Sequence, residues 1–317
     1  MIQNCQAHHI KNFVEIDLFD DSAFFKGIPV DEYPTMLKIW YKMKTGKELN
    51  LEQPKTFNEK IQWLKLYDRD PLRTQLTDKY LVREYVKDKI GEKYLIPLLG
   101  VWDRFDDINF DELPNKFVLK CNHGSGWNLI VQDKSQLDVA KAKSKFDRWM
   151  ATNFAFNGLQ MQYENIVPKI IAEQYIENKT GDLWDYKFWC FDGKVENIMF
   201  LSNRKQHLCK NNFDRNWNPQ KFTSSKYPGS NQIIEKPSNL DEMIELSENL
   251  SKGFNFVRID LYRLNDSSIK FGEFTFTPLN GVYTWNPEEM DDYFGALIKM
   301  RRNTSNFSYV DIRHKIY

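Results

Sequence analysis

Residues 254–281 read FNFVRIDLYRLNDSSIKFGEFTFTPLNG, and the predicted architecture starts from this stretch. Two runs, 254–264 and 269–277, are rich in aromatic and β-branched residues, which is typical of β-strands. The four residues between them, 265–268, are Asn, Asp and two Ser, which favour a turn. The sequence therefore predicts an antiparallel hairpin.

The polar residues of this hairpin are expected to share a face. Because side chains alternate along a strand, Arg258, Asp260 and Tyr262 point the same way. A symmetric turn places Asp260 opposite Glu273 and Arg258 opposite Thr275, with opposed Cβ atoms roughly 4.5–5.5 Å apart. The same alternation puts four residues of the second strand on one face: Ile269, Phe271, Glu273 and Thr275.

Two acidic side chains at this separation repel each other unless a cation lies between them. Mg²⁺ is one candidate, because it prefers a few carboxylates together with phosphate oxygens. The alternative is a solvated sheet face on which the guanidinium of Arg258 bridges both acids. The hairpin alone leaves both interpretations open.

The composition limits the classes of function. The 317 residues contain 44 Lys and Arg against 44 Asp and Glu, which argues against broad, non-specific binding of nucleic acid. Aromatic residues make up 15% of the chain, and they suit core packing or stacking on bases and sugars. The four cysteines show no CxxC pair, so neither a disulfide framework nor a zinc site is expected. No membrane span or secretory signal peptide is visible, so we expect a cytoplasmic protein.

Periodicity, caps and breakers give a coarse secondary structure. Helices are predicted at 34–45, from Thr56 to Asp70-Pro71, and at 77–90, 135–155, 241–252 and 288–300. Strands are predicted at 117–121, 128–131, 168–176, 184–191 and 194–200, the last two joined by an Asp192-Gly193 turn. Residues 202–232 are polar and predicted to be irregular, either as a mobile loop over a site or as an insertion.

Lysines near a glycine-containing loop suggest a phosphate site. Residues 122–126, Asn-His-Gly-Ser-Gly, follow a strand that carries Lys120. Backbone N–H groups of such a loop can lie over phosphates, although most loops of this kind are only hairpin turns. Lys79 and Arg83 lie on one side of the helix predicted at 77–90, where the ordinary interpretation is a solvated face.

In this order the segments resemble the ATP-grasp superfamily, and within it the TupA-like branch named for a teichuronopeptide biosynthesis protein. The segments that carry the resemblance are DKYLVREYV (78–86), FVLKCNHGSG (117–126), IIAEQYIE (170–177), DYKFWCFDGKV (185–195) and FVRIDLY with KFGEFTFTPLNG (256–281). Together they span most of residues 57–300.

The resemblance implies an α+β protein with the ATP-grasp fold, in which two α+β subdomains with antiparallel sheets clasp ATP. Four regions are expected. They are a helical N-terminal region at 1–56, a helical or linker part at 57–115, a lid subdomain at 116–176 and a metal-binding catalytic subdomain at 177–317.

The resemblance also assigns roles to residues. Lys79 and Lys120 would contact the phosphates of ATP. The lid loop would be His123, Gly124, Ser125 and Gly126. The hinge that reads adenine through backbone groups would be Glu173, Gln174, Tyr175 and Ile176, with a nearby acid on the ribose.

The metal and catalytic roles fall on the two late hairpins. Asp260 and Glu273 would hold Mg²⁺ between the β- and γ-phosphates, and Arg258 and Lys187 would act in catalysis. The family pattern Glu-x-Asn is Glu-Phe-Thr here, so Thr275 would be the third ligand, directly or through water, unless Asn280 replaces it.

The implied activity is that of an ATP- and Mg²⁺-dependent carboxylate–amine ligase that forms an amide through an acyl phosphate. The expected partners are a sugar carboxylate, on a nucleotide- or lipid-linked saccharide of cell-surface polysaccharide synthesis, and an amino acid or amine. The alternatives are a kinase on the same scaffold, a glycosyltransferase of a polysaccharide pathway, and a nucleotide-binding partner without catalysis.

Overall fold

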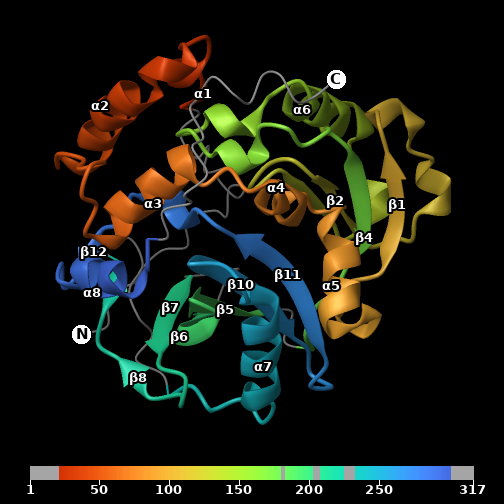
Figure 1. The fold of residues 1–317 in the computed structure, drawn as a ribbon. Helices are drawn as coiled ribbons and strands as arrows, with labels where there is room; N and C mark the ends of the chain where they lie inside the picture. Colours follow the sequence, from red (N-terminus) through yellow and green to blue (C-terminus); the bar gives the residue numbers. More distant parts are fainter. Residues whose placement is uncertain (1–20, 180–182, 203–207, 225–232, 301–317) are drawn as a thin grey trace, which may run out of the picture.

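The computed structural model describes residues 21–179, 183–202, 208–224 and 233–300, which form two antiparallel sheets with helices around them. The smaller sheet has the order β1-β4-β2-β3 and lies at the upper right of Figure 1. Its strands are β1 (Leu98–Trp102), β2 (Phe117–Cys121), β3 (Asn128–Val131) and β4 (Ile170–Gln174). These bounds confirm the strands predicted at 117–121 and 128–131.

The larger sheet has the order β11-β10-β5-β6-β7-β8, and β9 and β12 form a separate pair. Its strands are β5 (Trp184–Phe191), β6 (Lys194–Ser202), β7 (Cys209–Phe213), β8 (Pro219–Gln220), β10 (Phe256–Arg263) and β11 (Ile269–Thr275). The separate pair consists of β9 (Thr223–Ser224) and β12 (Trp285–Asn286). Residues 208–224 are therefore more regular than predicted, and residues 203–207 and 225–232 lie outside the described chain.

Eight α-helices surround the sheets in the described chain. They are α1 (Ser22–Phe25), α2 (Tyr33–Thr45), α3 (Phe57–Tyr67), α4 (Pro71–Thr77), α5 (Val82–Ile90), α6 (Val139–Met150), α7 (Leu240–Ser251) and α8 (Met290–Leu297). Gly46 ends α2 in the left-handed conformation, and Thr56 and Glu59 form a capping box at the start of α3. Both of these boundaries were predicted.

The helix predicted at 77–90 is wrong in its first turn. Asp78 is buried, and its Oδ1 accepts hydrogen bonds from the backbone N–H groups of Tyr80 and Leu81. The side chain thus holds residues 78–81 in a turn, and α5 begins only at Val82. Lys79 therefore lies in the turn between α4 and α5 and not on a helix.

The helix predicted at 135–155 is also shorter than expected. Ser135 lies in a 3₁₀ turn, and Asp138 caps α6 by accepting a hydrogen bond from the N–H of Lys141 at 2.9 Å.

The late hairpin has the predicted register at the site and a different one near its turn. Asp260 pairs with Glu273 and Arg258 with Thr275, as predicted. The register then shifts, because Gly272 is an extra residue between the partners of Asp260 and Leu261. A Cβ atom at Gly272 would lie 3.0 Å from the backbone oxygen of Asp260, so the bulge brings the two strands close together here.

This bulge corrects the predicted face of β11. Ile269 and Phe271 are buried in the core against α7, whereas Glu273 and Thr275 are only half-buried and contact Arg258 on the other face. The four residues therefore do not share one face.

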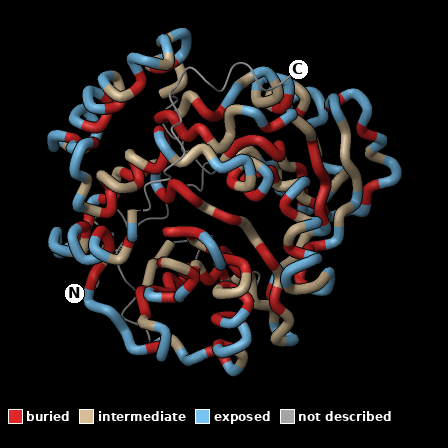
Figure 2. Tube along the Cα trace, viewed as in Figure 1, coloured by how far each residue is buried: buried red, intermediate tan, exposed pale blue. Residues whose placement is uncertain are grey.

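Both faces of the larger sheet are covered. One face carries the core formed with α7 and α5, and the other carries an aromatic core formed with α3 and α8. Trp189 is completely buried in the second core, and Trp285 is 8% exposed, so both serve packing. Figure 2 shows the buried positions running along the strands of both sheets.

Helix α3 joins distant parts of the chain. The Asn58 side chain donates to Tyr283 O at 2.9 Å and accepts from Tyr283 N at 2.9 Å, and it also donates to Asp291 at 3.1 Å. Lys65 Nζ donates to Gly158 O at 2.9 Å and to Asn280 O at 2.7 Å. Burial lowers the pKa of Lys65.

The N-terminal helices do not form a separate body. Residues of α1 and α2 share a hydrophobic core with Leu66 of α3 and with Leu159 and Met161 of the segment that precedes β4. The segment that contains Leu159 and Met161 thus packs against the N-terminal helices.

Candidate functional site

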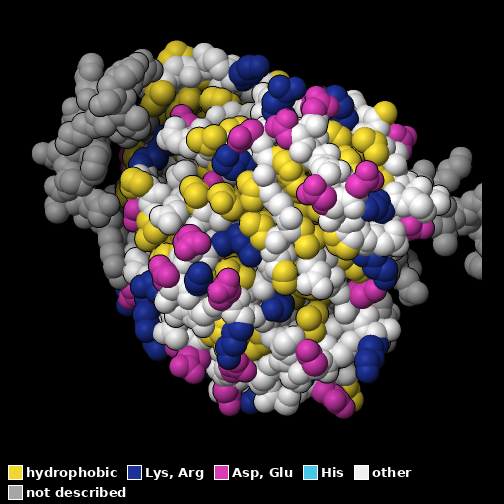
Figure 3. Space-filling view, turned by 90° about the vertical axis from the view of Figure 1, so that its right-hand side faces the viewer, with side chains coloured by type: hydrophobic (Ala, Val, Ile, Leu, Met, Phe, Trp, Pro, Cys, Tyr) yellow, Lys and Arg dark blue, Asp and Glu magenta, His cyan; other side chains and the backbone are white. Residues whose placement is uncertain are grey.

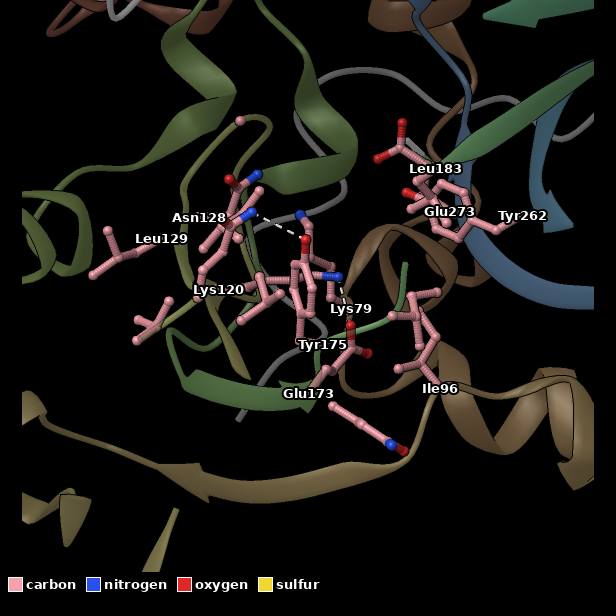
Figure 4. A pocket seen from close by; sticks show the side chains of 18 of the residues that line it. Lys79, Ile96, Lys120, Asn128, Leu129, Glu173, Tyr175, Leu183, Tyr262 and Glu273 are labelled. Atoms are coloured by element: carbon pink, nitrogen blue, oxygen red, sulfur yellow. Dashed lines mark hydrogen bonds and ion pairs between the residues drawn. The ribbon is translucent and has the colours of Figure 1, made fainter. Parts of the chain in front are cut away.

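A cavity of about 1120 Å³ lies between the two sheets. Its walls come from the turn before α5, from β2, β3 and β4, and from β11. Figure 4 shows Lys79, Lys120 and Glu173 on one side of this space and Tyr262 and Glu273 across from them. Eight of the residues assigned from sequence line it: Lys79, Lys120, Gly126, Glu173, Gln174, Tyr175, Ile176 and Glu273.

A buried carboxylate organises the cationic side of the cavity. Glu173 of β4 accepts from Lys120 of β2 on Oε2 and from Arg83 of α5 on Oε1, the latter at 3.2 Å. The Glu173 side chain is 10% exposed and the Arg83 side chain 15%, so Arg83 is not on the solvated face that the sequence suggested. Sequence spacing placed Arg83 beside Lys79, but only the fold brings it to the cavity.

Lys79 lines the same cavity and contacts the glycine loop. Its Nζ donates to the backbone oxygen of Gly124, and its N–H donates to Asn122 O at 3.2 Å. Burial lowers its pKa, the charge of Lys120 adds to this effect, and Glu273 opposes it. The charges of Lys120 and Glu273 thus act on Lys79 in opposite directions.

The residues of the predicted lid loop do not all face the cavity. Of its four residues, Gly126 lines the cavity. The His123 ring is buried, with Nδ1 3.1 Å from Asn122 Oδ1 and Nε2 3.1 Å from Trp149 O at the end of α6. Burial, together with nearby Lys79, lowers the pKa of His123 to about 4. The histidine side chain therefore supports the loop from behind.

The hinge predicted at 173–176 lies at the end of β4. Gln174 N donates to Pro97 O at 3.0 Å, so this amide completes the sheet. The Tyr175 hydroxyl accepts from Gln132 Nε2 at 3.0 Å and donates to Glu177 Oε2 at 3.1 Å, which connects β3 with the hinge. Glu177 also lines the cavity.

The two facing carboxylates are bridged by an arginine. Arg258 donates to both oxygens of Asp260, at 2.7 and 2.8 Å, and to Glu273 Oε1 at 3.0 Å. Lys187, on the neighbouring strand β5, contacts Asp260 Oδ2 and lies 3.0 Å from Asp185 Oδ2. The bridging arrangement named above as the alternative to a metal is therefore present, but inside the protein and not on a solvated face.

Burial and charge act in opposite directions on this cluster. Burial raises the pKa of Asp260, but the charges and hydrogen bonds of Arg258 and Lys187 outweigh it and lower the pKa to about 2. Burial likewise lowers the pKa of Arg258, and Asp260 and Glu273 more than offset this and raise it. Asp260 and Arg258 therefore both remain charged at neutral pH.

The donor set is compatible with a Mg²⁺ ion that arrives with a nucleotide. In the part of the chain that the structure describes, no group of three His, Cys, Asp or Glu side chains could hold a metal alone. Mg²⁺, however, is usually held by one or two carboxylates plus substrate phosphates. Glu273, with its side chain 38% exposed, opens on the cavity, and the buried Asp260 lies behind it.

The structure distinguishes the two candidates for the third ligand by position. The Thr275 hydroxyl donates to Glu273 Oε1 at 3.0 Å and so lies in the carboxylate cluster. The Asn280 side chain contacts Lys65 through Oδ1 and donates to Asn157 O at 3.1 Å, in the segment before β4.

Sequence reasoning missed two tyrosines of the site. Tyr163 lines the cavity with Lys79, and the charges of Glu273 and Arg258 both reach its hydroxyl. Tyr283 lies against the other side of Arg258, and burial raises its pKa to about 12. Neither lies in a motif, because both follow irregular segments whose path the local sequence does not predict.

The surface around the cavity carries mixed charge. Figure 3 shows Lys and Arg side chains interspersed with Asp and Glu over the face that carries β1 and α5. None of the described helices has the length and apolar character needed to cross a bilayer.

Comparison with known proteins gives one family and a set of distant folds. Residues 59–299 match the family described as TupA-like ATPgrasp. No curated protein matches the sequence.

Solved structures with similarity include the ATP complex of D-alanine–D-alanine ligase from Bacillus anthracis. It is 18% identical, with 63% of this chain and 55% of that chain covered and a TM-score of 0.38. An L-amino acid ligase from Bacillus licheniformis is 14% identical, with coverage of 61% and 41% and a TM-score of 0.39. An ADP complex of N5-carboxyaminoimidazole ribonucleotide synthetase is 10% identical, with coverage of 78% and 57% and a TM-score of 0.43. The chain spans about half the length of the solved structures it matches first.

Proposed function

This chain belongs to the TupA-like ATP-grasp family, and from that premise we propose that it is an ATP- and Mg²⁺-dependent carboxylate–amine ligase. One observation carries the proposal. The cavity between the sheets places the lysines Lys79 and Lys120 on one wall and the Glu273 carboxylate on the other. A triphosphate with its divalent cation has the charge pattern that complements these two walls.

Each wall has a role in the proposed reaction. Lys79, Lys120 and the backbone at Gly126 hold the phosphates, and the backbone of Tyr175 and Ile176, beyond the end of β4, takes the adenine. Glu177 takes the ribose. Glu273 and Asp260, with Thr275 beside them, would hold Mg²⁺, which would supply positive charge to the triphosphate.

Arg258 and Lys187 act on the charge that develops during transfer. Arg258 is fixed by Asp260 and Glu273, so its guanidinium needs no reorganisation to meet a phosphoryl oxygen. Lys187 is held in the same way by Asp185 and Asp260. Positioning and electrostatics supply the catalysis, and no covalent enzyme nucleophile is required.

The proposed reaction has two steps. An oxygen of the substrate carboxylate attacks the γ-phosphorus, and the bond from that phosphorus to the bridging oxygen breaks. ADP departs, and an acyl phosphate is formed. The amine nitrogen then attacks the acyl carbon, the carbon–oxygen bond to phosphate breaks, and the amine gives up a proton as the amide forms.

For the substrates we propose a uronic acid on a nucleotide- or lipid-linked saccharide, with an amino acid or simple amine as acceptor. The name of the family supports this choice. We propose a cytoplasmic reaction, because ATP is supplied there.

Product analysis tests the proposal. The protein is incubated with ATP, Mg²⁺ and pooled uronic-acid sugars, with and without pooled amino acids and amines, and ADP, AMP, phosphate and sugar masses are followed. ADP and free phosphate that require both pools, with a mass gain equal to an amide, are the expected result. A phosphate mass gain on one substrate would instead indicate a kinase, and no ATP binding would refute the proposal. Glu273→Gln serves as the inactive control.

A further inference from the structure

Arg83 links Glu173 to a second segment of the chain. Its Nη1 lies 3.2 Å from Glu173 Oε1, and its Nη2 donates to Ile96 O at 2.8 Å, just before β1. The two contacts fix the guanidinium plane, because both nitrogens of the fork are anchored. The Arg83 side chain lines the cavity and is 15% exposed.

Glu173 is shared between two cations of different mobility. Lys120 contacts Oε2, and the Lys120 side chain, 21% exposed, is the more accessible of the two. Lysine is a flexible point charge that can change partners, whereas an anchored arginine cannot do so without losing both contacts. Lys79 takes no part in this arrangement, since its Nζ contacts the Gly124 carbonyl.

A phosphate that enters the cavity competes with Glu173 for Lys120. If Lys120 turned to the phosphate and nothing else held Glu173, a carboxylate with a 10% exposed side chain would be left without a counter-charge. Removing one partner of a buried ion pair is strongly unfavourable for that reason. Arg83 prevents this loss, because it stays on Oε1.

We propose that Arg83 is a positioning residue that holds Glu173, so that Lys120 exchanges the Glu173 carboxylate for a nucleotide phosphate when ATP binds. The inference rests on the proposed function and adds to it a residue and a step. It assigns Glu173 the role of keeping Lys120 in the cavity until the nucleotide arrives. Arg83 then keeps the vacated carboxylate neutralised.

The test measures equilibrium binding of ATP with Mg²⁺, by calorimetry and without acceptor, for Arg83→Met, Glu173→Gln and the double variant. Arg215→Met, which removes another arginine–glutamate pair far from the cavity, is the matched control. We expect Arg83→Met to bind ATP at least about tenfold more weakly, a free-energy change of about 1.4 kcal/mol. The double variant should bind ATP less than about threefold more weakly than Glu173→Gln, because residue 173 then carries no charge that Lys120 would leave unpaired.

If Arg83→Met weakens ATP binding equally in the wild-type protein and in Glu173→Gln, the inference is overturned. This result would show that Arg83 acts through Ile96 or through the nucleotide directly. If Arg83→Met does not fold, Glu173→Gln alone decides. The ratio of adenosine Kd to ATP Kd should be about threefold higher for Glu173→Gln than for the wild-type protein, because Lys120 no longer has to leave a carboxylate when it binds phosphate. An unchanged or lower ratio would overturn the inference. Absence of ATP binding by the wild-type protein would refute the proposed function itself.

Discussion

Asp260→Asn and Glu273→Gln should have different effects on stability although both remove one carboxylate from the same pair of strands. The Asp260 side chain is 2% exposed and takes two hydrogen bonds from Arg258 and one from Lys187. The Glu273 side chain is 38% exposed and takes one from Arg258. The first substitution therefore leaves two buried cations, Arg258 and Lys187, with less counter-charge. The second removes a half-exposed carboxylate, and Arg258 keeps both of its contacts with Asp260.

The magnitudes can be worked from the structure. The pKa of Asp260 falls from 3.8 to about 2, which corresponds to about 2 kcal/mol at neutral pH. Breaking a buried ion pair costs about 3–5 kcal/mol, so we expect Asp260→Asn to lose about 3 kcal/mol. Glu273→Gln should lose less than about 1 kcal/mol, as half-exposed pairs do.

Urea unfolding followed by tryptophan fluorescence measures the difference. With a slope of about 3 kcal/mol per molar, the midpoint should fall by about 1 M for Asp260→Asn and by less than about 0.3 M for Glu273→Gln. Because the folded pKa is the lower one, the gap between wild type and Asp260→Asn should be constant above about pH 5 and shrink as the pH falls from about 4 towards 2. Equal midpoints for the two variants would refute the reasoning.

Three further predictions concern single residues. Asn58→Ala removes three buried side-chain hydrogen bonds, two of them to the Tyr283 backbone, and should cost about 3 kcal/mol by the same urea titration; a loss below about 1 kcal/mol would contradict this. Lys65→Met leaves the Gly158 carbonyl oxygen without the Lys65 donor and removes one of two donors to Asn280 O, because Gln62 Nε2 still donates there at 3.0 Å; it should cost about 2 kcal/mol, whereas wild-type stability would show that the contacts contribute nothing. Lys120→Ala should raise the apparent KM for ATP about tenfold in an ADP-release assay, and unchanged ATP kinetics would remove this lysine from the phosphate site.

The hairpin shows how far sequence reasoning reaches. Counting outward from a symmetric turn gave the pairing of Asp260 with Glu273 and of Arg258 with Thr275. It failed between the turn and the site, because a bulge cannot be read from strand propensity. A signal was nevertheless present: when Gly272 is skipped, apolar and polar residues alternate without interruption from Ile269 to Phe276.

Helix boundaries could be predicted where a local capping residue sets them and not elsewhere. The capping box at Thr56 and the glycine at residue 46 act within one turn, so the sequence contains all the information. The start of α5 depends on Asp78, whose carboxylate is buried by the surrounding fold. Burial is a property of the whole chain, and this is why the helix was predicted four or five residues too early.

The site was predictable to the extent that it consists of motifs. Lys120 of β2, Glu173 of β4 and Glu273 of β11 were assigned to the site from their segments, whereas Arg83 was placed on a solvated face and Tyr163 was not named. The positions of these two depend on the packing of α5 against α7 and the larger sheet, and on the irregular path before β4.

The contacts of Asn58 have a consequence for the order in which the protein folds. Its side chain and backbone bind Tyr283 and Asp291, which are separated from it by 225 and 233 residues. Contacts of such long range are slow to form, because the entropy of loop closure must be overcome first. During synthesis the start of α3 therefore waits, without its partners, until residues 283 to 291 have left the ribosome. The aromatic core on that side of the larger sheet can close only then, so within the described chain it is protected from aggregation later than the core against α7.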